Sequence, residues 1–252
     1  MRATLLACAA VGTLAAGAAS AQNATLTDWT QGWSGQATPY AWLPTINGSQ
    51  EGPDGQPLVD LDTNDVLSAL DMAFMASATF QKDRVGIILD AVYAKLGTDG
   101  TWVQNRVKTQ TDTKLGFYTA AVSYRVVDEP KGYLDVYGGA RYFDTNVEFK
   151  LSATNLGDTF SKSLTWTDPI IGLRGAVALS ERWSLHGFAD YGGFDGADDQ
   201  SWELYGGANY AFAERWEGTF GYRYVSIQKK VTDRAALDID IQGPLVGITY
   251  RF

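Results

Sequence analysis

Apolar and polar residues alternate with a period of two along most of residues 72–252. In the clearest run, Trp202, Leu204 and Phe212 share one face, and the residues of the other face are mostly small or polar. A period of two is typical of β-strands, because successive side chains point to opposite faces of a sheet. The pattern predicts ten strands, at residues 31–47, 71–81, 85–96, 112–127, 133–150, 162–179, 183–194, 201–213, 216–228 and 237–252.

The predicted connections alternate in length. Short polar turns fall at residues 82–84, 128–132, 180–182 and 213–215, and longer polar stretches lie near 48–70, 97–111, 151–161, 195–200 and 229–236. Short turns at one end and long loops at the other are typical of an outer-membrane barrel. We therefore predict an all-β fold, a closed antiparallel up-and-down transmembrane barrel of about ten strands. An even count places both ends of the barrel chain on the periplasmic side.

Two segments leave the strand count open between eight and twelve. Pro39 and Pro44 interrupt the first predicted strand, and proline cannot donate a backbone hydrogen bond to a sheet. Residues 58–70 have the composition of an extra strand, a short helix in the lumen or a loop.

The aromatic residues of the apolar face lie at two levels. At ~3.3 Å per residue and a tilt of ~40°, the eight to ten residues between the levels span about 20–25 Å along the barrel axis. This spacing matches the apolar band of a membrane barrel, whereas the core of a soluble sandwich or lipocalin-like barrel gives no reason for two levels. The predicted girdle consists of Phe80, Trp183, Phe212 and Trp216 beside the short turns, and Tyr191, Trp202 and Tyr224 near the opposite strand ends.

The opposite face of the strands carries acidic and basic residues together, and in a membrane barrel this face lines the lumen. Two arrangements follow. If the charges pair across the lumen, they fill it and stiffen the barrel. If they separate onto two walls, they line a narrow pore for ions or small solutes. The residues of this predicted charge network are Asp90, Asp135, Arg141, Asp168, Arg174, Asp190, Glu203 and Arg223.

The first 21 residues have the pattern of a secretory signal peptide. Arg2 precedes an apolar stretch at residues 5–18, and Ala19-Ser20-Ala21 provides small residues for cleavage before Gln22. We expect cleavage to leave one barrel domain, residues 22–252. Cleavage would also remove Cys8, which is the one cysteine of the chain.

The last strand has apolar or aromatic residues at every second position, namely Val246, Ile248, Tyr250 and Phe252. This pattern resembles the C-terminal signal that the Gram-negative barrel-assembly machinery reads. The sequence also resembles a family of uncharacterised proteobacterial outer-membrane β-barrel proteins, which are small and porin-like. The segments that carry this resemblance are residues 38–44, 190–194, 221–224 and 243–252. The resemblance implies a barrel in the outer membrane of a Gram-negative bacterium, in contact with lipid and lipopolysaccharide, and implies no substrate.

Composition narrows the function further. The net charge of −9 argues against nucleic acid, whose phosphates require a basic surface. With one cysteine and one histidine, we expect no cofactor and no metal site.

An outer-membrane enzyme would need a base that titrates near neutral pH, and His186 near Asp190 is the available candidate. We expect a structural barrel with a charged, largely filled lumen and no catalytic residues.

The stretch at residues 48–70 suggests a further alternative, because it carries several acidic residues. Oxygen ligands suit Ca²⁺ and Mg²⁺, which could bridge this loop to lipopolysaccharide phosphates. The segment from Asp60 to Asp65 lacks the turn glycine and the closing glutamate of a calcium loop. The acidic residues are Glu51, Asp54, Asp60, Asp62 and Asp65.

Overall fold

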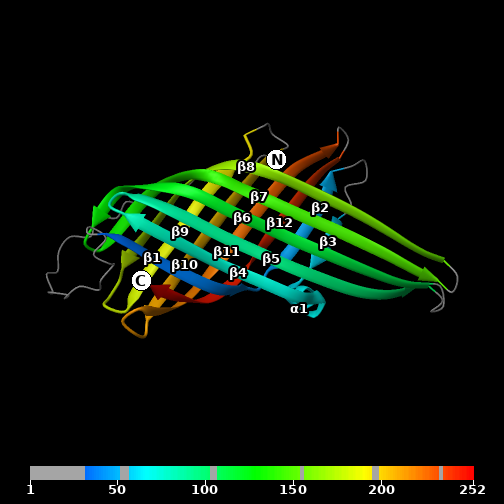
Figure 1. Ribbon diagram of the computed structural model, residues 1–252, viewed down its shortest axis with the longest axis horizontal. Helices are drawn as coiled ribbons and strands as arrows, with labels where there is room; N and C mark the ends of the chain where they lie inside the picture. Colours follow the sequence, from blue (N-terminus) through cyan, green and yellow to red (C-terminus); the bar gives the residue numbers. More distant parts are fainter. Residues whose placement is uncertain (1–31, 52–56, 103–106, 154–155, 195–198, 233–234) are drawn as a thin grey trace, which may run out of the picture.

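The computed structural model describes residues 32–51, 57–102, 107–153, 156–194, 199–232 and 235–252. These residues form twelve strands and one short helix (Figure 1). The elements are β1 (Trp33–Trp42), β2 (Thr45–Glu51), β3 (Pro57–Leu61), α1 (Thr63–Ala69), β4 (Leu70–Lys82), β5 (Val85–Trp102), β6 (Val107–Glu129), β7 (Gly132–Ala153), β8 (Leu156–Ala178), β9 (Trp183–Gly192), β10 (Asp199–Ala211), β11 (Trp216–Thr232) and β12 (Ala235–Arg251).

Ten of the strands form a closed antiparallel barrel, as predicted. The ring runs β1-β4-β5-β6-β7-β8-β9-β10-β11-β12 and closes where Gln36 of β1 pairs with Arg251 of β12. Each strand from β4 to β11 pairs with the next strand in the chain, which confirms the up-and-down order. The end of the barrel that carries the short turns is called the turn end below, and the opposite end is called the loop end.

The two faces of the barrel wall have opposite character. Ile171 and Phe220 point outward and are 60% and 51% exposed, whereas Arg141 and Glu203 point inward and are 1% exposed. A soluble barrel would reverse this arrangement, because burial of apolar surface drives its folding. The apolar face is therefore the outer face of this barrel.

The first predicted strand, residues 31–47, is wrong as one continuous strand. It divides at Leu43-Pro44 into β1 and β2, and both pieces pair along β12. Proline breaks the regular ladder because it has no N–H to donate. The backbone N–H of Leu43 still donates to the Pro244 carbonyl, at 3.0 Å, so the two pieces stay aligned on β12.

Residues 58–70 combine two of the three predicted structures. β3 pairs with β2 outside the ring, and α1 follows it directly. Asp62 begins the helix with a capping box. Its Oδ1 accepts from the backbone N–H of Asp65 at 2.8 Å, and Oδ2 of Asp65 accepts from the N–H of Asp62 at 3.2 Å. These reciprocal bonds satisfy backbone donors that the first turn leaves unpaired.

Three stretches predicted as loops, 97–111, 151–161 and 229–236, are largely strand in their described residues. β5 and β6 stay paired from Gly97↔Asp112 to Trp102↔Val107, and β7 and β8 stay paired to Ala153↔Leu156. A polar sequence does not end a β-ladder by itself, since cross-strand hydrogen bonds use the backbone. Figure 1 shows these hairpins as long extensions of the barrel wall.

The predicted signal peptide, at residues 1–21, lies outside the described residues. In the part of the chain that the structure describes, no helix is long and apolar enough to cross a membrane.

Candidate functional site in the barrel lumen

The lumen is divided into a polar half at the turn end and an apolar half at the loop end. Strand alternation directs the side chains of both halves inward, since every second residue of each strand faces the axis. All eight residues of the predicted charge network lie in the polar half or at its border. In the structure they belong to six strands, β5, β7, β8, β9, β10 and β11.

A central layer spans the lumen at mid-barrel. Nη2 of Arg223 on β11 lies 2.9 Å from Oδ1 of Asp90 on β5. The hydroxyl of Tyr40 on β1 donates to Oδ2 of Asp90 at 2.9 Å and accepts from Nη1 of Arg223 at 2.6 Å. Three strands separate β5 from β11 one way around the ring and five the other way, so this layer bridges opposite walls.

Glu203 on β10 joins this layer to a second arginine. Its carboxylate lies 2.5 Å from Nε of Arg223 and 2.5 Å from Nη2 of Arg141 on β7. Nη2 of Arg141 also donates to Oδ2 of Asp190 at 2.8 Å, and the Tyr137 hydroxyl donates to the same oxygen at 2.9 Å. The side chains of Arg141, Glu203 and Arg223 are each at most 3% exposed, so their charges depend on each other for compensation.

A second cluster lies nearer the turn end, around Asp135 on β7. Nε of Arg125 donates to one oxygen of Asp135 at 2.9 Å, and Nε of Arg174 donates to the other at 3.0 Å. Nη1 of Arg174 reaches the Thr79 hydroxyl at 3.1 Å, so it also crosses between well-separated strands, β8 and β4. The Tyr133 ring covers the Arg125 guanidinium at 4.2 Å.

Asp168 is held by neutral hydrogen-bond donors, whereas the other seven residues of the predicted network form ion pairs. Its Oδ2 accepts from the Ser201 hydroxyl at 3.0 Å and from the indole N–H of Trp166 at 3.3 Å. The predicted residues are therefore brought into two ion-pair clusters and one hydrogen-bonded site.

Several lumen residues were missed by the sequence prediction. Arg125 is 1% exposed, but a register shift between Arg125 and Val127 interrupts the alternation of β6 that would have marked it as inward. Glu217 pairs with Arg251 at 2.8 Å and accepts from the Asn209 amide at 3.0 Å. Tyr40 lies before the proline break, where the strand pattern was weakest.

The polar half encloses a cavity of about 180 Å³. His186 and Tyr205 lie on its wall, and Nε2 of His186 is 2.8 Å from the Tyr205 hydroxyl. Nδ1 of His186 and Oδ1 of Asn209 are buried with no hydrogen-bond partner among the described residues. Buried polar atoms beside a cavity of this size are the usual setting of ordered water, and there is room for about six molecules. The predicted neighbour of His186, Asp190, is bonded to Tyr137 and Arg141 instead.

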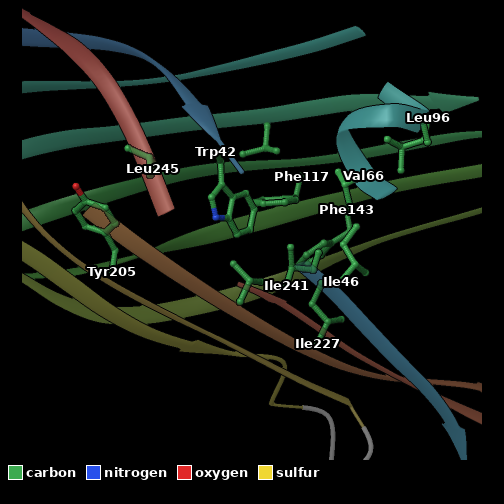
Figure 2. Packing of buried hydrophobic residues seen from close by; sticks show 13 residues of the cluster. Trp42, Ile46, Val66, Leu96, Phe117, Phe143, Tyr205, Ile227, Ile241 and Leu245 are labelled. Carbon is green, nitrogen blue, oxygen red and sulfur yellow. The ribbon is translucent and has the colours of Figure 1, made fainter. Parts of the chain in front are cut away.

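The apolar half contains a second cavity of about 130 Å³, called the apolar chamber below. Figure 2 shows Val66 of α1 directed toward Phe117 and Phe143, with the Trp42 indole packed beside Phe117. The Phe143 and Trp166 rings stack at 4.6 Å. Residues of eight strands and the helix form most of the chamber wall: Trp42, Ile46, Val66, Val92, Leu96, Phe117, Phe143, Trp166, Ile227 and Ile241.

Arg223 marks the border between the two halves. Its guanidinium carbon lies 5.3 Å from the Trp42 ring centroid and 5.2 Å from that of Phe117, on its apolar side. Its nitrogens face Asp90, Glu203 and Tyr40 on the polar side. A planar guanidinium can serve both environments, because its faces stack on rings while its edge donates hydrogen bonds.

The predicted girdle and assembly residues lie on the outer face. Trp183, Phe212 and Trp216 are exposed beside the short turns, and Trp202 and Tyr191 are exposed toward the loop end. Trp202 and Tyr224 stack at 4.6 Å, and Phe80 packs edge to face on Phe252 at 5.9 Å. Of the predicted assembly signal, Val246, Ile248 and Phe252 are exposed and Tyr250 is partly exposed.

The acidic stretch offers no metal cluster among the described residues. Asp62 and Asp65 are engaged in capping α1, as described above. Asp54 lies outside the described residues.

Comparison with known proteins identifies the architecture. No protein-family model and no curated protein matches the sequence. Among solved structures, the outer membrane protease OmpT from Escherichia coli is similar, with a TM-score of 0.55 and 10% identity, over 91% of this chain and 100% of that chain. The fold is that of an outer-membrane β-barrel.

Two further solved structures are less similar. The translocator domain of the autotransporter NalP from Neisseria meningitidis matches with a TM-score of 0.45 and 16% identity, over 88% of this chain and 89% of that one. The outer membrane protein OprG from Pseudomonas aeruginosa matches with a TM-score of 0.34 and 12% identity, over 87% and 96%. The likeness to OmpT, at 10% identity, describes the fold alone, and function has to be argued from the lumen.

Proposed function

We propose that this chain is an integral outer-membrane barrel whose lumen is closed by ion pairs, so that it serves as a structural barrel and conducts no ions. The observation that carries the proposal is the central layer, in which Arg223 binds Asp90 across the lumen. The arrangement favours the first of the two alternatives raised by the sequence, in which the charges pair rather than separate onto two walls.

The membrane location is supported by the outer face. Exposed apolar side chains surround the ring, and aromatic residues cluster near the two levels that the sequence predicts. A closed ring pairs its backbone groups between strands, which is the condition for a sheet to lie in lipid. We propose outer-membrane lipid and lipopolysaccharide as the surroundings of this face, and the barrel-assembly machinery as the factor that inserts it.

Closure follows from the chemistry of the central layer. An ion that crossed the lumen would have to separate Arg223 and Arg141 from their carboxylates. These side chains are buried, and separating buried paired charges costs several kcal/mol per pair.

We propose no catalytic role for the lumen. The one histidine of the chain, His186, has the Tyr205 hydroxyl as its hydrogen-bond partner, and the carboxylate of Asp190 is bound to Arg141 and Tyr137. In acyl transfer a third group orients the histidine base, and Nδ1 of His186 has no hydrogen-bond partner among the described residues. The likeness to a protease covers the fold alone and does not supply this third group.

Single-channel recording of the refolded protein in a planar bilayer tests closure. The wild-type protein should give no conductance steps above background. The double variant Arg223→Ala with Asp90→Ala removes the cross-lumen pair without leaving either charge alone, and should give small steps. Arg182→Ala, in an exposed turn, is the matched control and should stay silent. Steady conductance by the wild type would refute closure and support the narrow pore.

The membrane location has its own test. The protein should fractionate with the outer membrane and migrate differently on gels before and after heating, because a closed barrel resists detergent. Recovery in the soluble periplasm would contradict the proposal.

A further inference from the structure

The apolar chamber differs from an ordinary protein core because it holds unfilled space. Its volume is about 130 Å³, and the described side chains that line it are apolar apart from two threonines, Thr63 and Thr145, and the indole nitrogens of Trp42 and Trp166. Protein interiors pack to the density of organic crystals and have few voids larger than a water molecule. A cavity of this size in a well-packed wall therefore suggests a ligand.

The character of the wall selects the class of ligand. Water needs two to four polar partners to occupy a cavity, and this wall offers few, in contrast to the polar cavity below Arg223. An apolar cavity of about 150 Å³ in another protein stays dry and binds benzene or xenon. Four aromatic side chains, Trp42, Phe117, Phe143 and Trp166, present ring faces and edges on which a flat apolar molecule can stack.

The barrel wall beside the chamber is not fully sealed by backbone pairing. β1 pairs with β4 from Trp33↔Lys82 to Pro39↔Ala76 and then leaves it to follow β12. Beyond Ala76, the part of β4 at residues 70–75 has no strand partner on that side within the described part of the chain. Met75 and Leu70 of this segment, with Leu67 of α1, line the chamber. The side chains of α1 and β4, rather than a continuous ladder, separate the chamber from the surroundings.

We propose that the apolar chamber is a binding site for a small apolar molecule, up to about the size of one aromatic ring. The inference goes beyond the closed barrel proposed above, because a barrel can be closed to ions whether or not its loop-side half binds a hydrocarbon. The ligand would be held by dispersion contacts with the aromatic wall and by removal of its surface from water.

Crystals of the refolded protein soaked with bromobenzene test the site directly. Anomalous diffraction at the bromine edge should show a peak inside the chamber of the wild-type protein. Ala94 lines the chamber, so Ala94→Phe should fill it and abolish the peak. Ala91 lies on the opposite face of the same strand, β5, and Ala91→Phe should keep the peak.

Ala94→Leu is a second filling variant in case the phenylalanine prevents folding, and migration before and after heating verifies that each variant is folded. Absence of a bromine peak in the wild-type chamber would overturn the proposal. A peak that persists in a folded filling variant would also overturn it, because the bound molecule would then lie elsewhere. Neither result changes the conductance expected of a closed barrel, so the two proposals fail separately.

Discussion

Nη2 of Arg223 lies 2.9 Å from Oδ1 of Asp90, and this ion pair joins two strands that face each other across the lumen. The two residues are 133 positions apart in the sequence. Their side chains are 3% and 17% exposed, so water screens the pair little. The pair therefore links opposite walls of the barrel, and in the function proposed above it also blocks the lumen.

Removal of one partner of this pair should destabilise the barrel strongly. Arg223→Ala leaves Asp90 and part of Glu203 without a counter-charge in a buried site, and such a change costs about 3–5 kcal/mol. Urea unfolding in detergent micelles or liposomes measures the loss. Arg182→Ala, in a turn at the barrel end, should be indistinguishable from the wild type. A loss no larger than that of the control would show that the central layer contributes nothing to stability.

The two arginines that share Glu203 should be energetically coupled. Arg141→Met and Arg223→Met each leave Glu203 with one partner, but together they leave it with none. A double-mutant cycle should therefore give an interaction energy of about 0.5–3 kcal/mol. Arg174 shares no ion-pair or hydrogen-bond partner with Arg223, so the pair Arg174→Met and Arg223→Met should be additive within about 0.5 kcal/mol. Additivity of the first pair would contradict a shared carboxylate.

A charge on the outer face should be tolerated in water but not in lipid. Phe220 is 51% exposed and lies midway along β11 between Trp216 and Tyr224, so Phe220→Arg would place a cation near the centre of the bilayer. We expect it to lower the unfolding free energy in liposomes by about 2–4 kcal/mol. Glu214→Arg, in a short turn, is the control and should have little effect. If both variants behave alike, this face does not contact lipid.

Close contact between strands should make replacement of one glycine destabilising, while replacement of another should leave the stability of the barrel unchanged. A Cβ added at Gly139 on β7 would press on the Ala120 carbonyl and lie 2.5 Å from the Cα of Ala121, and backbone atoms cannot rotate away. Gly139→Ala should therefore cost about 1–3 kcal/mol, the range for overpacking. A Cβ at Gly206 on β10 would meet nothing within 4 Å, so Gly206→Ala should be neutral or slightly stabilising. Equal unfolding midpoints for the two variants would refute this ranking.

The ring of ten strands was predictable because each strand repeats the same two-residue period and the short turns separate the strands. The position of Arg141 or Glu203 in the lumen followed from the same period. Their partners did not follow, because the sequence gives no measure of which strands face each other. Arg223 meets Asp90 through the curvature of the closed ring, which adjacent-strand reasoning does not reveal.

The apolar chamber was not predictable from alternation. Phe117 points inward beside the outward Tyr118, and Phe143 points inward beside the outward Tyr142. Where both faces of a strand are apolar, a period of two no longer distinguishes lumen from lipid. Adjacent aromatic residues in β6 and β7 were the available signal.

The division of the first predicted strand into β1 and β2 was also not predictable from its own residues. It depends on β12, which pairs with the chain on both sides of the proline break.

The β1–β12 seam has a consequence for how the chain folds. Thr38 and Thr249 are 211 residues apart in the sequence, and their hydroxyls meet at 2.8 Å across this seam. Contacts between such distant residues form late, because closing a long chain segment has a large entropic cost that is recovered only when the contacts form. Until β12 arrives, β1 and β11 both present unpaired strand edges, which are prone to aggregate. The interval before ring closure is therefore the period in which this chain most needs protection by chaperones.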